Sequence, residues 1–311
     1  MRGYLTTCEG ETYELPVLLA WEFSYTGSVP CDSFVLRCPY EAAMAEVLRR
    51  AVRFTAREDG ETAFAGVIDE YTARCGERGL QLEISGRGMA ALLLDSEAEA
   101  VSYEMATTEE IVKNHVTRWG VVCAGWEKAE AAGYRVANGA SQWKAVHDFA
   151  VLHAGLTPYF RADGALELRR AHEGKRVTID GRTPVTALVY CDRRYGVIAE
   201  ALAVDKKTGE RQSVRNEDFC ARGGRSRRVF YVPARSGRRM MRCTGEYQIE
   251  KSKEGAETLC ITAAGRLDAL PGDRADVEET KLGVSGSFRV IELRRRFDGD
   301  GETSEARMQR E

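Results

Sequence analysis

The order in which strand and helix patterns follow one another along the chain constrains the fold most strongly. β-forming residues dominate the first 95 positions, helical patterns follow up to about residue 174, and strand patterns return from Lys175 onward. A doubly wound sheet would alternate strands and helices throughout. The sequence therefore predicts an α+β chain with a β-rich domain at 1–95, an α/β insert at 96–174 and a second β-rich domain at 175–311.

The first domain is predicted to be a small antiparallel sheet or barrel. Its strand patterns are Tyr13–Leu19, Phe34–Leu36, Val52–Ala56, Thr62–Val67 and Gln81–Ile84. Asp59-Gly60 predicts a hairpin turn, because this pair tolerates the positive φ that such turns need. At the end of the domain, a strand leads through Gly86-Arg87-Gly88 into an apolar helical start, and we expect the two glycines to form a tight turn.

The insert is predicted to contain two helices and a hairpin. Thr107-Thr108-Glu109-Glu110 has the pattern of a capping box and opens a helix that ends at Gly120. Ser141 is the expected cap of a second helix, which ends at Gly155. Asp163-Gly164 then joins two short strands.

Size and composition indicate a folded chain that remains in the compartment where it is made. A chain of 311 residues with 43% hydrophobic content can bury a core, and it has no apolar run near the roughly 18 residues of a membrane span. The first residues lack the order of a secretory signal. Nine cysteines without a CxxC pair indicate reduced thiols rather than disulfides or a zinc ribbon.

The sequence contains no pattern of an active site, and we expect no enzyme activity, no metal and no cofactor. No two of the four histidines have the i, i+4 spacing of zinc ligands; they are His115, His147, His153 and His172. Gly86-Arg87-Gly88 lacks the third glycine of a dinucleotide-binding loop and the Gly-Lys-Ser/Thr ending of a P-loop.

One strongly basic segment is the candidate site. Residues 205–242 hold 12 Lys and Arg against 4 Asp and Glu, a local charge of +8, so a net charge of −3 leaves −11 on the remainder. The candidates for a partner- or phosphate-contacting loop are Arg222, Arg225, Arg227, Arg228, Arg235, Arg238 and Arg239. Since only Phe230 and Tyr231 supply aromatic rings there, a partner-facing loop is favoured over nucleic-acid binding, which stays the alternative function.

Three blocks of the sequence, taken together, resemble the baseplate hub proteins of contractile phage tails and phage-like particles, a family similar to the late-control D proteins. The blocks are Phe64–Asp69 with Ile84–Gly88 and Leu92–Ala98; Thr107–Val121 with Ser141–Gly155 and Tyr159–Leu168; and Leu270–Asp273 with Gly286–Val290 and Phe297–Thr303. Two departures are Arg294-Arg295-Arg296, where the family often has a histidine, and the basic segment.

The resemblance implies a structural role. Two tail-tube-like β-barrel domains per chain would let a homotrimer present six such units, so that a trimeric ring joins a six-fold tail tube to a trimeric central spike. The implied partners are the spike, the tail tube protein, other baseplate proteins and the tape-measure protein, without specific nucleic-acid binding. The implied location is the host cytoplasm during assembly and then the baseplate of the particle.

Overall fold

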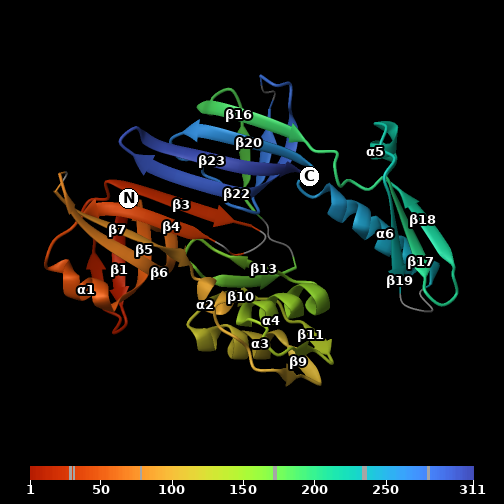
Figure 1. Ribbon diagram of the computed structural model, residues 1–311, viewed down its shortest axis with the longest axis horizontal. Helices are drawn as coiled ribbons and strands as arrows, with labels where there is room; N and C mark the ends of the chain where they lie inside the picture. Colours follow the sequence, from red (N-terminus) through yellow and green to blue (C-terminus); the bar gives the residue numbers. More distant parts are fainter. Residues whose placement is uncertain (28–29, 31, 78, 171–173, 233–236, 279–280) are drawn as a thin grey trace. The chain divides into compact units, whose positions relative to one another are not determined.

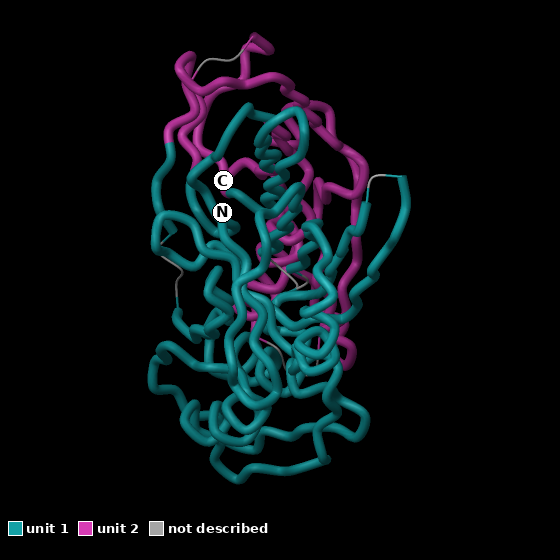
Figure 2. Tube along the Cα trace, turned by 90° about the vertical axis from the view of Figure 1, so that its left-hand side faces the viewer, with its two compact units in different colours: residues 1–177, 262–274, 290–306 teal, residues 178–261, 275–289, 307–311 magenta. Residues whose placement is uncertain are grey.

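The computed structural model describes residues 1–27, 30, 32–77, 79–170, 174–232, 237–278 and 281–311. The chain divides into two compact units, each of which collects segments distant in sequence (Figure 2). Unit 1 consists of residues 1–177, 262–274 and 290–306, and unit 2 consists of residues 178–261, 275–289 and 307–311. Among the described residues, no helix is both long and apolar enough to cross a membrane.

Antiparallel strands supply most of the regular structure (Figure 1). The strands before the insert are β1 (Arg2–Thr7), β2 (Thr12–Glu14), β3 (Ala20–Thr26), β4 (Ser33–Pro39), β5 (Ala51–Glu58), β6 (Glu61–Gly76) and β7 (Gly79–Gly88). Those within it are β8 (Val101–Ser102), β9 (Met105–Thr107), β10 (Cys123–Trp126), β11 (Glu130–Ala132), β12 (Arg135–Val136), β13 (Thr157–Phe160) and β14 (Leu166–Arg169).

The remaining strands and the helices complete the chain. The strands are β15 (Arg176–Ile179), β16 (Val185–Asp192), β17 (Glu200–Asp205), β18 (Arg211–Arg215), β19 (Arg227–Val232), β20 (Glu257–Ala264), β21 (Arg274–Val277), β22 (Gly286–Asp298) and β23 (Gly301–Arg310). The α-helices are α1 (Met44–Arg50), α2 (Ala91–Leu94), α3 (Thr108–His115), α4 (Gln142–Asp148), α5 (Glu217–Ala221) and α6 (Arg238–Lys253), with a 3₁₀ turn at Thr117–Trp119 and a π-helical turn at Phe149–Ala154.

Unit 1 is built on a sheet with the strand order β23-β22-β3-β4-β7-β6-β5-β1-β2. The sequence prediction of an α+β chain made mainly of antiparallel strands is confirmed. The described strands form no closed barrel, so the barrel-like layout of two domains stays a prediction. The division at 95 and 174 also stays a prediction; the structure places residues 290–306 in unit 1, where β22 pairs with β3 from Glu292 to Phe297.

An aromatic cluster fills the core of this sheet because phenylalanines alternate onto one face of neighbouring strands. Phe34 stacks on Phe54 with ring centroids 4.5 Å apart, and Phe23 stacks on Phe64 at 5.2 Å. All four rings are buried. The predicted hairpin turn between β5 and β6 is confirmed, since Asp59 and Gly60 both adopt positive φ, 52° and 86°.

The tight turn predicted at Gly86-Arg87-Gly88 is wrong, because β7 continues through Gly88 and the chain turns only afterwards. Gly86 pairs with Phe34 of β4 and with Ile68 of β6. A Cβ atom at this position would lie 2.7 Å from a ring carbon of Phe34 and would also collide with the carbonyl oxygen of Val67. Glycine is therefore required for close strand packing beneath an aromatic ring, not for a turn.

Arg87 links the sheet to the start of the insert. Its Nε lies 2.7 Å from Oδ2 of Asp69 in β6, and its Nη2 lies 2.7 Å from Oδ2 of Asp95, which directly follows α2. The hydrogen bonds from Arg87 are also the main reason that the pKa of Asp95 lies below its usual value. The arginine between the two glycines thus fixes the direction in which the chain leaves the sheet.

The insert has the elements that the sequence predicts. Thr107 caps α3 by accepting a hydrogen bond from the Glu110 backbone at 3.2 Å, and the Glu110 carboxylate accepts one from the Thr107 backbone at 3.1 Å. Ser141 caps α4, and Gly155 ends the helical region at φ 64°. The predicted hairpin is β13–β14. The insert has a hydrophobic cluster of its own, which runs from Leu93 to Leu168 and includes Ile111, Val146 and Phe149.

Unit 2 contains a three-stranded sheet with the order β18-β17-β19, covered on one face by α6. β18 pairs antiparallel with β17, and β19 pairs parallel with it. Met241 of α6 packs with Ala203 and Val232, and Ile249 packs with Ala201 and Phe230. Strand patterns dominate the sequence of this region, and α6, a helix of 16 residues, was not predicted.

Candidate functional site

The basic segment is not one loop, in contrast to the sequence prediction. Arg222 follows α5, Arg225 lies in the connection to β19, and Arg227 and Arg228 are the first residues of β19. Arg238 and Arg239 open α6. All six side chains are exposed. Arg235 lies outside the described residues, and so does His172.

Three of these arginines are held by carboxylates of unit 2. Arg222 pairs with Asp192, Arg227 lies 2.8 Å from Glu200 of β17, and Arg238 lies 2.6 Å from Glu210. Hydrogen bonds from Arg227 and Ser213 hold the pKa of Glu200 below its usual range. Within the described residues, Arg225, Arg228 and Arg239 have no ion-pair partner. The structure therefore divides the predicted set into paired and unpaired side chains.

The strand register gives the three-stranded sheet one open face. Side chains that alternate with those beneath α6 point to the other side. Three cross-strand rows result: Arg215, Glu200 and Arg227; Ser213, Leu202 and Val229; and Arg211, Val204 and Tyr231. Val229 and Tyr231 are 46% and 65% exposed. We call these nine residues the open sheet face.

A cavity of about 530 Å³ lies elsewhere in unit 2, beside α5 and the end of α6. Charged groups of both signs line it, among them Asp192, Arg222, Glu257 and Arg310. Arg222 pairs with Asp192, and Arg310 pairs with Glu257. These ion pairs leave few of the charged groups that line the cavity available to bind a ligand.

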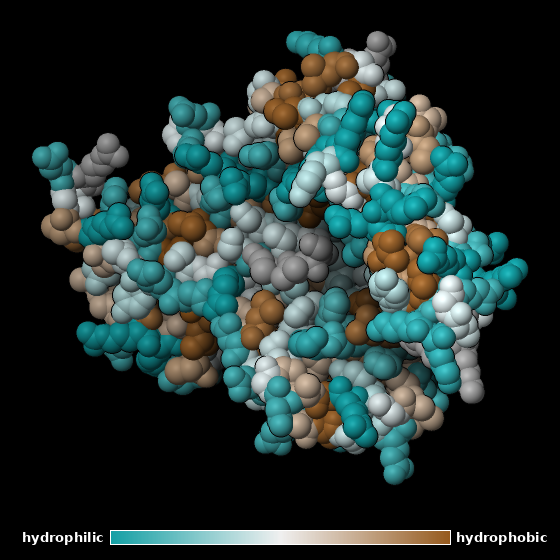
Figure 3. Space-filling view, turned by 45° about the vertical axis from the view of Figure 1, so that its right-hand side comes forward, coloured by the Kyte–Doolittle hydropathy of each residue, from teal (hydrophilic) through white to brown (hydrophobic). Residues whose placement is uncertain are grey.

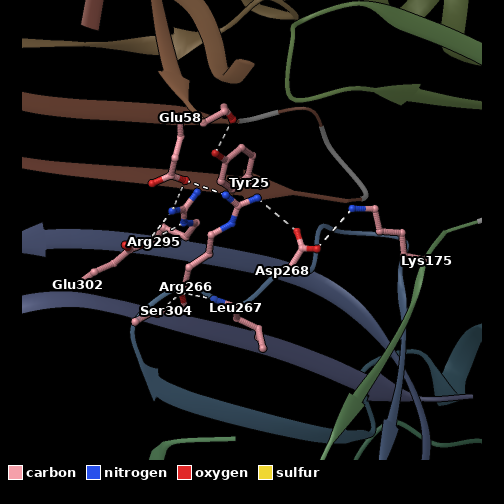
Figure 4. Close-up of polar contacts among 11 residues, drawn as sticks. Tyr25, Glu58, Lys175, Arg266, Leu267, Asp268, Arg295, Glu302 and Ser304 are labelled. Atoms are coloured by element: carbon pink, nitrogen blue, oxygen red, sulfur yellow. Dashed lines mark hydrogen bonds and ion pairs between the residues drawn. The ribbon is translucent and has the colours of Figure 1, made fainter. Parts of the chain in front are cut away.

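Unit 1 contains a chain of alternating charges that the sequence analysis did not predict (Figure 4). It leads from the surface to the interior in the order Lys175, Asp268, Arg266, Glu58, Arg295 and Glu302. Lys175 and Asp268 are largely exposed, whereas only 6% of the Arg295 side chain is exposed. A small cleft of about 120 Å³ lies beside the chain and is also lined by Tyr25.

Arg295 is the buried end of this chain, which we call the buried arginine cluster. Its guanidinium donates to Glu302 at 2.6 Å and to Glu58 at 2.8 Å, and it lies over the ring of Trp21 at 5.3 Å. Burial lowers the pKa of Arg295, but the bonds to Glu302 and Glu58 outweigh that effect and leave the pKa raised. A buried arginine with two carboxylates and an aromatic ring joins β22, β23, β3 and β5.

Asp32 is a second ionisable group of unit 1 and is partly buried. Burial raises its pKa to about 6, although hydrogen bonds from the backbone and hydroxyl of Thr26 partly oppose the shift. The folded protein thus binds a proton more tightly than the unfolded chain, so the contribution of Asp32 to stability falls as the pH rises from about 4 to 6.

Asp32→Asn is therefore expected to flatten the pH dependence of stability. The wild-type protein should lose up to about 3 kcal/mol more than the variant between pH 4 and 6. Urea denaturation at several pH values gives the difference between the two proteins, which cancels the other titrating groups. Parallel pH profiles would show that Asp32 ionises normally.

The insert contains a buried histidine with a structural role. The two ring nitrogens of His115 contact Oε1 of Gln142 at 2.7 Å and the hydroxyl of Tyr103 at 2.9 Å. Burial lowers the pKa of His115. His147 lies 3.6 Å from Asp148 and is 40% exposed. In the described part of the chain, no three His, Cys, Asp or Glu residues are placed to share a metal ion.

The sequence analysis also missed two arginines of the open sheet face. Arg211 and Arg215 lie on β18, on either side of Ser213, and belong to the two outer rows of the face. Arg211, Ser213 and Arg215 follow one another at a spacing of two residues, a strand pattern that places all three side chains on one face. This alternation is the sequence signal that indicates the open sheet face, whereas the density of basic residues is highest after Arg222.

No protein-family model matches the sequence, and a comparison with curated proteins finds no match. The structure, in contrast, is similar along its whole length to solved phage tail proteins. A tail protein from Neisseria meningitidis MC58 is similar over 100% of this chain and 96% of its own, with a TM-score of 0.76 at 18% identity. The 43 kDa tail protein of prophage MuSo2 from Shewanella oneidensis covers 100% and 98%, with a TM-score of 0.76 at 14% identity.

A third similar structure comes from a secretion system. The E. coli protein c3393, described as a component of the type VI secretion system with structural similarity to the T4 bacteriophage tail proteins gp27 and gp5, matches 94% of this chain and 73% of its own. Its TM-score is 0.58 at 12% identity. At these identities the similarity concerns the fold. The chain has the fold of phage tail proteins, which confirms at the level of the fold the resemblance that the sequence indicated.

Proposed function

We propose that the chain is a structural, non-enzymatic baseplate hub subunit of a contractile tail or phage-like particle. Three copies form a ring that joins the six-fold tail tube to the trimeric spike. The observation that carries this proposal is the similarity in fold to two tail proteins over the entire chain, including the insert and the closing hairpin. The host cytoplasm is the site of assembly, and the baseplate is the final location.

The proposed ring solves a problem of symmetry. A trimer can contact a six-fold tube only if each chain presents two similar surfaces, which is the role of the two barrel-like domains predicted at 1–95 and 175–311. We propose that these domains reach their barrel-like form in the assembled ring, where neighbouring chains cover the strand edges that are open in one chain.

The β6–β7 hairpin offers such an edge. β6 pairs with β5 only as far as Val67, whereas its pairing with β7 continues to Gly76. In the described residues, the outer edge of β6 after Val67 is unpaired. Tyr71 and Leu80 of the same hairpin are 41% and 49% exposed, so that an added strand from another copy would cover both backbone and apolar side chains.

Light scattering after gel filtration tests the assembly state. We expect a mass about three times 34.5 kDa, for the chain alone or together with its spike partner. Changing both Tyr71 and Leu80 to aspartate should lower this mass, because charge on the hairpin opposes strand addition. Val17→Asp is the control, since Val17 is also exposed but lies outside the hairpin. A monomer under both conditions would contradict the trimeric ring.

Nucleic-acid association through the basic segment is the second candidate function. It is supported by the exposed Arg225, Arg228 and Arg239, for which the described residues provide no carboxylate. Such binding should weaken steeply with added salt and with changes of Arg225, Arg227 and Arg228 to glutamate. Salt-insensitive or absent binding of an oligonucleotide would remove this candidate.

A further inference from the structure

We propose that the open sheet face of unit 2 binds an acidic protein segment with apolar residues at its centre, supplied by another protein. This inference deepens the proposed function, because it rests on the chain acting within a baseplate, where such a partner would be a neighbouring component. Side chains of β17, β18 and β19 form the proposed binding surface.

The centre of the open sheet face is apolar and uncovered. Leu202 and Val204 of β17 lie beside Val229 and Tyr231 of β19 in the strand register. Leu202 and Val204 are partly exposed, and Val229 and Tyr231 are exposed. Hydrophobic patches bordered by hydrophilic side chains occur on the surface of the protein (Figure 3). α6 covers the other face, so these four residues contribute nothing to the core beneath the helix.

The border of the face is basic. Arg215 and Arg227 stand at the two ends of one row, and Arg211 stands at the end of another. Glu200, between Arg215 and Arg227, is the only carboxylate among the nine residues and pairs with Arg227 at 2.8 Å. Among the described residues, none forms an ion pair with Arg211. The face therefore carries an excess of two positive charges around an apolar centre.

The charges of the open sheet face indicate which kind of partner binds there. The excess positive charge on the border attracts carboxylates, and the apolar centre gains from contact with aliphatic or aromatic side chains. Nucleic acid fits this face less well, because Glu200 repels phosphate and three of the four central residues are aliphatic and cannot stack on bases. A strand or helix with apolar residues facing the sheet and acidic residues at its margins satisfies both parts of the face.

The binding test uses a short fluorescein-labelled peptide with valines at its centre and glutamates at both ends, followed by fluorescence anisotropy with the full-length protein. We expect saturable binding. The double variant Arg211→Glu, Arg215→Glu should bind at least about tenfold more weakly, since each charge reversal turns an attraction into a repulsion. Arg228→Glu is the control: Arg228 is exposed on β19 of the same sheet but belongs to the face that α6 covers, so its change should leave the affinity unaltered.

Other probes distinguish the proposed acidic and apolar protein segment from other ligands of this face. A peptide with serine in place of valine should bind weakly, and equal binding would overturn the role of the apolar centre. Tighter binding of a single-stranded oligonucleotide than of the peptide would overturn the choice of a protein partner. Absence of peptide binding, or equal loss in the double variant and in Arg228→Glu, would also overturn the proposal.

Light scattering on the same variants distinguishes a failure of the proposed binding at the open sheet face from a failure of the proposed trimeric ring. A trimer that does not bind the peptide contradicts only the open sheet face, whereas a monomer that binds it contradicts only the trimeric ring. If the double variant loses the trimer, the face is an interface between copies of this chain and the proposal of a separate partner is wrong. Circular dichroism melting of each variant confirms that it is folded.

Discussion

Arg295→Met is expected to lower the free energy of unfolding by about 3 kcal/mol. The substitution keeps an apolar stem beside Trp21 but removes the positive charge between Glu58 and Glu302. Glu58 would then keep only its ion pair with Arg266, and Glu302 would lack a cation in a largely dry site. Their side chains are 17% and 22% exposed, which keeps the expected loss at the lower end for a broken buried ion pair.

The neighbouring arginine provides the control. Arg294 forms an exposed ion pair with Glu22 at 3.5 Å, with 57% of its side chain exposed. Arg294→Met should therefore change stability by at most about 0.5 kcal/mol. Urea denaturation followed by tryptophan fluorescence measures both variants. Equal losses for the two would show that the buried arginine cluster contributes no more than a surface pair.

Gly86→Ala is expected to cost about 3 kcal/mol, although it adds only a methyl group. Gly86 lies in β7 between β4 and β6, so that strands on both sides limit its movement. The added carbon would collide with the ring of Phe34, which itself stacks on Phe54 and has no free space. Relief of the collision requires a shift of the aromatic core or of the strand pairing.

Gly76→Ala is the matched change. Gly76 lies at the end of β6, its φ is not positive, and a Cβ atom there would meet nothing within 4 Å. Its replacement should be neutral or slightly stabilising, by up to about 1 kcal/mol, because alanine restricts the unfolded chain. Thermal melting of the two variants makes the comparison. A similar melting temperature for both would contradict the close packing at Gly86.

Patterns formed by residues close together in the sequence were sufficient to predict much of the fold. The capping box at Thr107 and Glu110 and the Asp59-Gly60 turn depend on residues within four positions of one another, and both occur as predicted. Gly86 was recognised as a position that needs glycine, but its reason depends on Phe34, which is distant in sequence. A single sequence does not show which strand will lie opposite a glycine.

The candidate site depended on contacts that the sequence does not reveal. Burial of Arg295 requires Glu58, which is 237 residues away, so the run Arg294-Arg295-Arg296 by itself does not show that its middle residue is buried. α6 was missed because its buried residues are few, Met241, Gly245 and Ile249, and because arginines surround its start. The open sheet face was not predicted either. Its rows combine residues of β17, β18 and β19, and only the strand register shows that these residues are neighbours.

The most direct test of the account is cryo-electron microscopy of the assembled particle. We predict density for three copies of this chain at the junction between the tail tube and the spike, with the two β-rich domains of each copy facing the tube. Absence of the chain from purified particles, or its presence at another position or in another number, would contradict its role as the baseplate hub.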